Sequence, residues 1–170
     1  MEQKIRILGI APYEGMKALM SSMADEYSQV DLTLFVGDME QGLEIAKNNF
    51  HGNYDVVISR GGTARMLQKN ISLPVVEIQV SLYDLLCALR LAEASSNTRK
   101  ITIVSFDNIT ANAKLLCDLM SYDMDIHTVD GPEDVESTLA ELQEKHCGAI
   151  LCDAVSNSTA KRLGLNSFLI

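Results

Sequence analysis

The sequence has no tryptophan and is poor in other aromatic residues and in histidine. Of its 170 residues only 5% are aromatic, and three are histidine. So small an aromatic set leaves little for stacking bases, sugars or a flavin. A hydrolytic triad needs a histidine held beside its nucleophile. None of His51, His127 and His146 closely follows a predicted buried strand, so we expect surface or polar-face roles for them.

Long apolar runs, a secretory leader and closely spaced cysteines are also missing. No run of 18 apolar residues occurs, and the amino terminus has no basic region followed by a long apolar core. We therefore expect a cytoplasmic protein with no membrane partner. Cys87, Cys117, Cys147 and Cys152 form no CxxC pair. We interpret them as reduced core thiols, and predict no disulfide framework, metal or cofactor.

Acidic residues outnumber basic residues in this chain. The chain has 14 Lys and Arg against 23 Asp and Glu, a formal net charge of −9. A surface that grips a phosphate backbone needs a basic patch, so we predict no direct contact with nucleic acid. Neither a GxGxxG nor a Walker sequence occurs. A small anion remains a candidate ligand, because a locally positive pocket can exist within an acidic protein.

What the chain does contain is a buried-strand pattern that runs into a polar, glycine-rich turn. Residues 55–59 include three consecutive β-favouring aliphatic residues, and the polar residues that follow are Ser59, Arg60, Gly61, Gly62 and Thr63. Open α/β sheets bind ligands at this end of their strands. The glycines would let backbone N–H groups approach an anion, and a helix expected over residues 64–69 would direct its positive end there. An alternative interpretation also stays open, in which this segment is a purely structural turn with Thr63 as the helix cap.

Strand and helix patterns alternate through the first eighty residues. We predict strands at 4–10, 30–36, 55–59 and 74–78, with helices near 16–27, at 39–49 and at 64–69. Short connections between parallel strands give right-handed βαβ units, so residues 1–80 are expected to form one α/β lobe. The first helix carries an apolar stripe that we expect in the core, comprising Met16, Leu19, Met20, Met23 and Tyr27.

The second half repeats the alternation after a predicted helix at 81–94. We interpret residues 81–100 as a connector, and residues 101–170 as a second α/β lobe. Its strands are expected at 101–105, 124–129, 148–152 and 167–170, and its helices at 108–120, 132–145 and 156–163. The predicted fold is α/β, with two flavodoxin-like or Rossmann-like parallel-sheet lobes and a ligand cleft between them. Because an apolar strand usually leads to a further element, we expect the chain to be part of a longer protein.

Four segments resemble the amino-terminal sensor domain of propionate catabolism activators of the PrpR type. They are VISRGGTA at 57–64, PVVEI at 74–78, ITIVSFDN at 101–108 and AILCD at 149–153. Those proteins are bacterial enhancer-binding regulators that work with the alternative sigma factor, sigma-54. The resemblance implies two α/β lobes that sense a small anionic metabolite, a 2-methylcitrate-like carboxylate. It also implies control of an AAA+ ATPase module and a helix-turn-helix module, which these 170 residues do not contain.

The resemblance also implies a ligand site in the first lobe. Carried over by position, it comprises Ser59, Arg60, Gly61, Gly62 and Thr63, with Pro12 and Tyr13 beside it. Arg60 would pair bidentately with the anion. From the second lobe, sheet topology rather than a motif places Ser105, Asn108, Asp153 and Ser156.

Other interpretations stay open at this stage. A two-lobed racemase-like enzyme needs a thiolate at a strand end in each lobe; Cys152 suits one lobe, but the other offers Ser59. A phosphoacceptor receiver domain needs an aspartate where Ser59 stands. A third interpretation is a module for homodimerisation. The partners that we predict are therefore a small anionic metabolite, the remaining modules of the same regulator, and a second copy of the chain.

Overall fold

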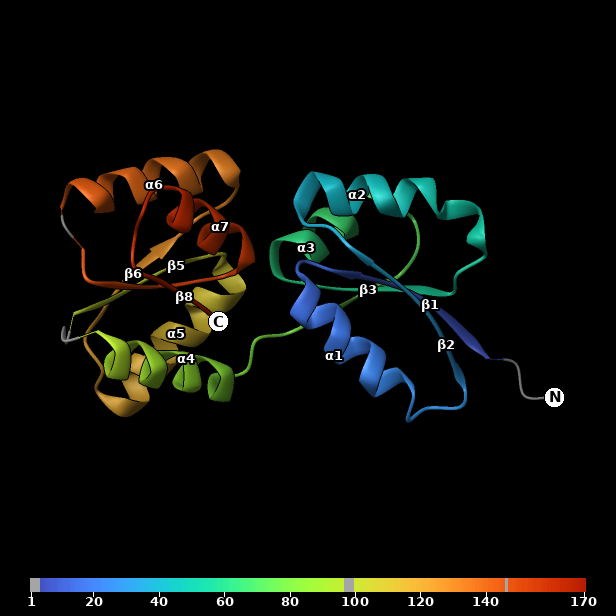
Figure 1. Cartoon of the computed structure of the whole chain (residues 1–170), viewed down its shortest axis with the longest axis horizontal. Coiled ribbons are helices and arrows are strands. Elements are labelled where there is room, and N and C mark those ends of the chain that lie inside the picture. Colours follow the sequence, from blue (N-terminus) through green and yellow to red (C-terminus); the bar gives the residue numbers. More distant parts are fainter. Residues whose placement is uncertain (1–3, 97–99, 146) are drawn as a thin grey trace. The chain divides into compact units, whose positions relative to one another are not determined.

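The computed structural model describes residues 4–96, 100–145 and 147–170. The chain divides into two units, Met1–Gln79 and Val80–Ile170, and each is described by itself. Each unit is a four-stranded sheet flanked by helices, and all neighbouring strands are parallel (Figure 1). The α/β class and the two parallel-sheet lobes predicted from the sequence are confirmed.

The first unit has the strand order β2-β1-β3-β4. Its strands are β1 (Ile5–Ala11), β2 (Val30–Val36), β3 (Val56–Arg60) and β4 (Val75–Ile78). Its helices are α1 (Glu14–Ala24), α2 (Met39–Asn48) and α3 (Gly61–Asn70), with a 3-10 turn, η1 (Phe50–Gly52), after α2. Helices α2 and α3 pack side by side on one face of the sheet, and α1 lies on the other (Figure 1). The carboxyl ends of all four strands therefore share one edge.

The apolar stripe of α1 is only half buried. Met16 and Met20 pack against the sheet with Ala11, as expected. Leu19, Met23 and Tyr27 are exposed, so the prediction that the whole stripe lies in the core is wrong. Helix α1 ends at Ala24, so Tyr27 lies beyond it. Helical spacing shows which residues share a face, but not whether a neighbour covers it.

The second unit has the strand order β6-β5-β7-β8. Its strands are β5 (Ile101–Ser105), β6 (Met124–Thr128), β7 (Ala149–Cys152) and β8 (Ser167–Leu169). Its helices are α4 (Leu82–Ser95), α5 (Asp107–Met120), α6 (Pro132–Glu144) and α7 (Ala154–Arg162). Helices α4 and α5 cover one face of the sheet, and α6 and α7 cover the other (Figure 1). The central strands β5 and β7 are buried along their whole length, as their apolar sequences predict.

Helix α4 is part of the second unit rather than a separate connector. It begins with a capping box, in which the Ser81 hydroxyl accepts a hydrogen bond from the Asp84 N–H and the Asp84 carboxylate accepts one from the Ser81 N–H. Its buried face, which includes Leu85, Leu89 and Ala92, packs into the core of the second sheet. The predicted connector 81–100 thus supplies a core helix, while its residues 97–99 lie outside the described residues.

All four cysteines are free thiols, but they differ in exposure. Cys152 is buried, Cys117 and Cys147 are partly buried, and Cys87 is exposed on α4. The interpretation of all four as core thiols is therefore wrong for Cys87, because it lies on the solvent side of its helix. Within the described part of the chain, no helix combines the length and the apolar character needed to cross a membrane.

Candidate functional site

The carboxyl edge of the first sheet carries the residues predicted to bind an anion. Strand β3 ends at Arg60 and helix α3 begins at Gly61, so the expected turn is in fact the end of a strand and the first turn of a helix. Arg60 is the N-cap residue, with an extended backbone and no side-chain cap bond. Gly61 has φ +58°, a conformation that favours glycine, and a Cβ there would meet no described atom within 4 Å beyond its chain neighbours.

The two hydroxyl groups of this segment are used inside the first unit. The Ser59 Oγ donates to the carbonyl of Ile10 at 2.7 Å and is fully buried. The Thr63 Oγ1 accepts from the N–H of Met39 at 3.0 Å and is also buried. Ser59 thus ties β3 to β1, and Thr63 ties α3 to the start of α2. Thr63 is the third residue of α3, so the alternative in which it caps the helix is wrong.

We expect the change Thr63→Val to destabilise the first unit by about 1–3 kcal/mol, because it leaves the buried N–H of Met39 without its acceptor. Met39 has φ 39°, so its backbone is held in an uncommon conformation that the bond helps to fix. Thermal denaturation followed by circular dichroism measures the effect. Thr33→Val on β2 makes the same chemical change at a half-buried strand position and serves as the control. Equal melting temperatures for the two variants would contradict a structural role for Thr63.

Pro12 and Tyr13 lie at the same edge as Arg60. They follow directly after β1, which is the parallel neighbour of β3, and both are half-buried. Tyr13 is the N-cap residue of α1, and its carbonyl accepts from the N–H groups of Met16 and Lys17, each at 3.2 Å. The structure therefore brings every first-unit residue of the predicted site to one sheet edge.

In the second unit three of the four predicted residues form one buried cluster. The Asp153 carboxylate accepts from the Ser105 hydroxyl at 2.7 Å, from the Ser156 N–H at 2.9 Å and from the Ser156 hydroxyl at 3.1 Å. Asp153 is the N-cap residue of α7 and is only 7% exposed. These bonds join the end of β5 to the start of α7. Asn108 follows Ser105 by three positions, lies in the first turn of α5, and is half-buried.

Cys152, the candidate nucleophile of a racemase-like enzyme, is poorly suited to that role. Cys152 is fully buried at the end of β7. Burial, and next the charge of Asp153, raises the pKa of the Cys152 thiol well above its usual range. The thiol is therefore neutral near pH 7, whereas the reactive form of cysteine is the thiolate.

We expect Cys152 to resist alkylation in the native protein, while Cys87 reacts readily because it is exposed. Iodoacetamide labelling at pH 8, with peptide mass spectrometry over time, compares the two thiols directly. The same labelling in denaturant, where both should react, is the control. If native Cys152 were labelled as fast as Cys87, the prediction that its thiol is unreactive would be wrong, and the enzyme interpretation would regain support.

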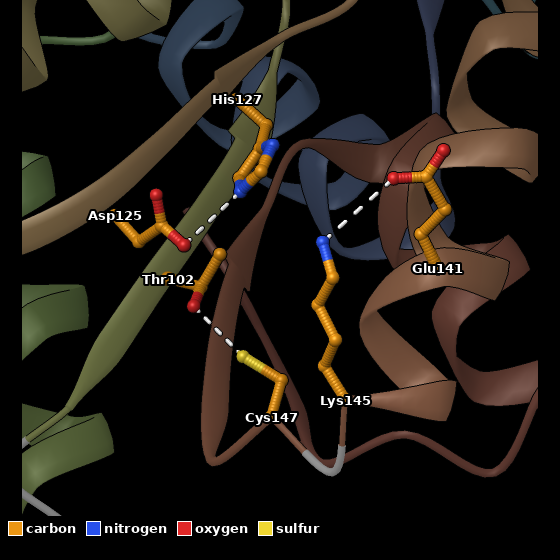
Figure 2. Close-up of polar contacts among 6 residues, drawn as sticks. All are labelled: Thr102, Asp125, His127, Glu141, Lys145 and Cys147. Atoms are coloured by element: carbon orange, nitrogen blue, oxygen red, sulfur yellow. Dashed lines mark hydrogen bonds and ion pairs between the residues drawn. The ribbon is translucent and has the colours of Figure 1, made fainter.

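A second group of polar contacts in this unit also lacks the arrangement of a catalytic triad (Figure 2). The Cys147 Sγ lies 2.8 Å from the Thr102 Oγ1, and the His127 Nε2 lies 3.2 Å from the Asp125 Oδ2. The thiol thus contacts a hydroxyl group and the imidazole contacts a carboxylate, rather than each other. Lys145 and Glu141 make an exposed pair at 3.9 Å, which contributes little to stability.

The other two histidines and the possibility of a metal site are considered next. His51 is exposed in η1, whereas His146 lies outside the described residues. Over residues 4–96, 100–145 and 147–170, no three His, Cys, Asp or Glu side chains gather as metal ligands do.

A protein family and several solved structures match the chain. The family described as propionate catabolism activator, the PrpR amino-terminal region, matches residues 26–170. No curated protein matches the chain. An NtrC family transcriptional regulator from Clostridium acetobutylicum is similar in structure, with a TM-score of 0.84 and 16% identity over 98% of this chain and 87% of that one. At this identity the match shows a shared fold.

Weaker structural matches have TM-scores below one half. A LacI family transcriptional regulator from Mycobacterium smegmatis has a TM-score of 0.47 and 15% identity, over 94% of this chain and 73% of that one. A periplasmic solute-binding protein from Actinobacillus succinogenes, with bound D-allose, has a TM-score of 0.44 and 16% identity, over 97% and 76%. These scores are too low to add to the fold assignment.

Proposed function

The chain belongs to the propionate catabolism activator family, a family of regulatory sensor domains, and from this premise we propose which ligand it senses and where. It is the effector-sensing domain of a bacterial sigma-54-dependent regulator, and its effector is a small carboxylate of the 2-methylcitrate kind or a related small anion. It acts in the cytoplasm, without catalysis and without touching nucleic acid itself. Its partners are the effector and the ATPase and DNA-binding modules of the same regulator.

The observation that carries this proposal is the start of α3 at the carboxyl edge of the first sheet. The first N–H groups of a helix have no acceptor within the helix, and the helix dipole makes that end positive. Here the first two helical residues are Gly61 and Gly62, which have no side chains of their own beside these N–H groups, and both residues are buried. Arg60 stands immediately before them and can offer a planar, bidentate donor to a carboxylate.

Neighbouring residues complete the proposed site in the first unit. Pro12 and Tyr13 share its edge, and the Tyr13 hydroxyl offers a further donor. Ser59 and Thr63 support the site indirectly, because their hydroxyls fix β3 and α3 to neighbouring backbone. A buried, bonded residue that fixes a ligand-binding backbone contributes through position rather than contact.

In the second unit we propose that Asn108 is the ligand contact, and that Ser105, Asp153 and Ser156 hold the start of α7 in place. Binding would stabilise one conformation of the domain, and this population shift would be the signal to the other modules. The chain passes from one unit to the other between Gln79 and Val80, so the hinge would lie there.

Thermal denaturation of the purified chain against di- and tricarboxylates, phosphates and amino acids tests the proposal. A ligand at a hundred times its dissociation constant stabilises by about 2.7 kcal/mol, which raises the melting temperature of a chain of this size by roughly 5–10 °C. We expect such a shift with one class of small anion and no turnover of that compound. The absence of a shift with every compound would contradict the proposal and favour the dimerisation module.

A further inference from the structure

Strands β3 and β4 carry an apolar patch of side chains beside the candidate site. Successive side chains of a strand point to opposite faces of its sheet. Val57 and Val75 belong to the core cluster that α2 and α3 cover. Ile58 and Ile78 belong instead to the cluster that α1 covers. The two isoleucines therefore lie on the α1 side of the first sheet.

Arg60 lies on the same side of the sheet as these isoleucines. It follows Ile58 by two positions, and its backbone is extended, with φ −130° and ψ 147°, so the alternation continues to the end of β3. In the pairing of β3 with β4, Arg60 is opposite Ile78. Neighbouring strands lie about 4.8 Å apart, so the stem of the arginine side chain runs next to an aliphatic side chain.

Helix α1 leaves this half of the sheet face open. Among the helices described for the first unit, α1 alone lies on this side, and it packs on β1 and β2 (Figure 1). Met20 approaches β1 so closely that a Cβ on Gly9 would meet its Cε at 3.0 Å. On β4, by contrast, Val76 shares the side of Ile78 and is 51% exposed. We call the patch the β3–β4 face; it consists of Ile58, Arg60, Val76 and Ile78.

We propose that the effector carries an apolar body, such as a short alkyl chain, next to the carboxylate that Arg60 binds. This inference rests on the proposed function, and it narrows the effector from small anions in general to small carboxylates with few other polar groups. The carboxylate meets the guanidinium and the first N–H groups of α3 at the sheet edge. From there the apolar body lies along the β3–β4 face, first on Ile78 and then on Val76.

The composition of the β3–β4 face favours this class of ligand over a highly charged or hydroxylated one. Apart from Arg60 its side chains are aliphatic, so they offer no hydrogen bond to hydroxyl groups or further carboxylates. A polar group placed on them would lose water without gaining a partner, which costs free energy. Tyr13 belongs to the same cluster on the α1 side, so its ring adds apolar surface near the edge.

The size of the face also favours a small molecule. A stable contact with another protein buries about 800 Å² per partner, which four side chains do not provide. A small ligand needs much less surface, because each methylene that leaves water strengthens binding by about fourfold. The position of the face, directly beside the candidate anion site, lets one small molecule use both.

A series of straight-chain monocarboxylates from acetate to hexanoate tests the proposal, by isothermal titration calorimetry on the 170-residue chain. We expect the dissociation constant to fall by roughly two- to fourfold for each added methylene. We also expect 3-hydroxybutyrate to bind more weakly than butyrate, and citrate to bind no better than butyrate. Affinity that is independent of chain length, or citrate binding more tightly than every alkyl carboxylate, would overturn this proposal and leave the proposed function standing. Failure of every anion to bind would overturn both.

Three threonine substitutions locate the alkyl chain. Ile78→Thr should weaken binding of every member from propionate upward, whereas Val76→Thr, one step farther from Arg60, should weaken only the longer members. Ile5→Thr is the matched control, because Ile5 is 48% exposed but lies at the amino end of β1. Circular dichroism checks that each variant is folded, and the exposed Val76 position keeps the test usable if Ile78→Thr is unstable. Equal losses in Ile5→Thr and Val76→Thr would overturn the proposed location.

Discussion

The change Arg60→Ala should almost abolish the thermal shift given by the active anion. A hydrogen bond to a charged group contributes about 1.5–3 kcal/mol, so losing a bidentate pair weakens binding by roughly a hundredfold or more. At the concentration that gave about 2.7 kcal/mol of stabilisation before, the variant would retain less than about 0.5 kcal/mol. The residual shift would be roughly 1–2 °C.

The fold of the first unit should survive this change. The backbone of Arg60 lies opposite Ile78 in the β3–β4 pairing, and that pairing does not depend on the side chain. The ligand-free melting temperature checks this expectation. Lys69→Ala is the matched control, because it removes one positive charge from the last turn of the same helix and should leave the shift intact. Arg60→Lys should give an intermediate shift, since it keeps the charge but loses the planar fork. A full shift in Arg60→Ala would sink the assignment of the site.

The elements of the fold could be predicted because each carries a strong local signal. The strand at 101–105 is an uninterrupted β-favouring segment, and it is buried throughout. Helix α4 has its capping box at Ser81 and Asp84, and helix α6 has Pro132 at its start. The predictions that were wrong concern side chains whose burial depends on what packs against their helix. Leu19 and Cys87 belong to apolar helix sequences, yet each lies on a side that no described residue covers enough to bury it.

The position of the candidate site could be predicted better than the roles of its residues. Parallel strands have their carboxyl ends at one edge, so Tyr13 and Arg60 had to lie near each other. The partners of the hydroxyl groups could not be predicted, because they are distant in the sequence. Ser59 donates to a carbonyl 49 positions away, and Ser105 donates to a carboxylate 48 positions away. A local pattern contains no information about such contacts.

Replacing Asp153 with alanine should destabilise the second unit by about 3 kcal/mol. The loss of an N-cap side chain costs about 1 kcal/mol. The hydroxyls of Ser105 and Ser156 are fully buried and would lose their acceptor, which adds about 1–3 kcal/mol. A domain of about this size loses roughly 4–8 °C of melting temperature per kcal/mol, so the melting temperature of the second unit should fall by roughly 12–24 °C.

Asp134→Ala provides the matched control for this prediction. The Asp134 carboxylate also accepts a backbone N–H, that of Asp130 at 3.1 Å, but the bond is exposed and water can replace it. The combined change Ser105→Ala and Asp153→Ala should cost less than the sum of the single changes, because the serine no longer needs an acceptor. If Asp153→Ala melts like Asp134→Ala yet loses the anion-induced shift, Asp153 contacts the ligand instead. If it melts early but retains the shift, the cluster holds α7 in place and Asn108 is the second-unit residue to test next.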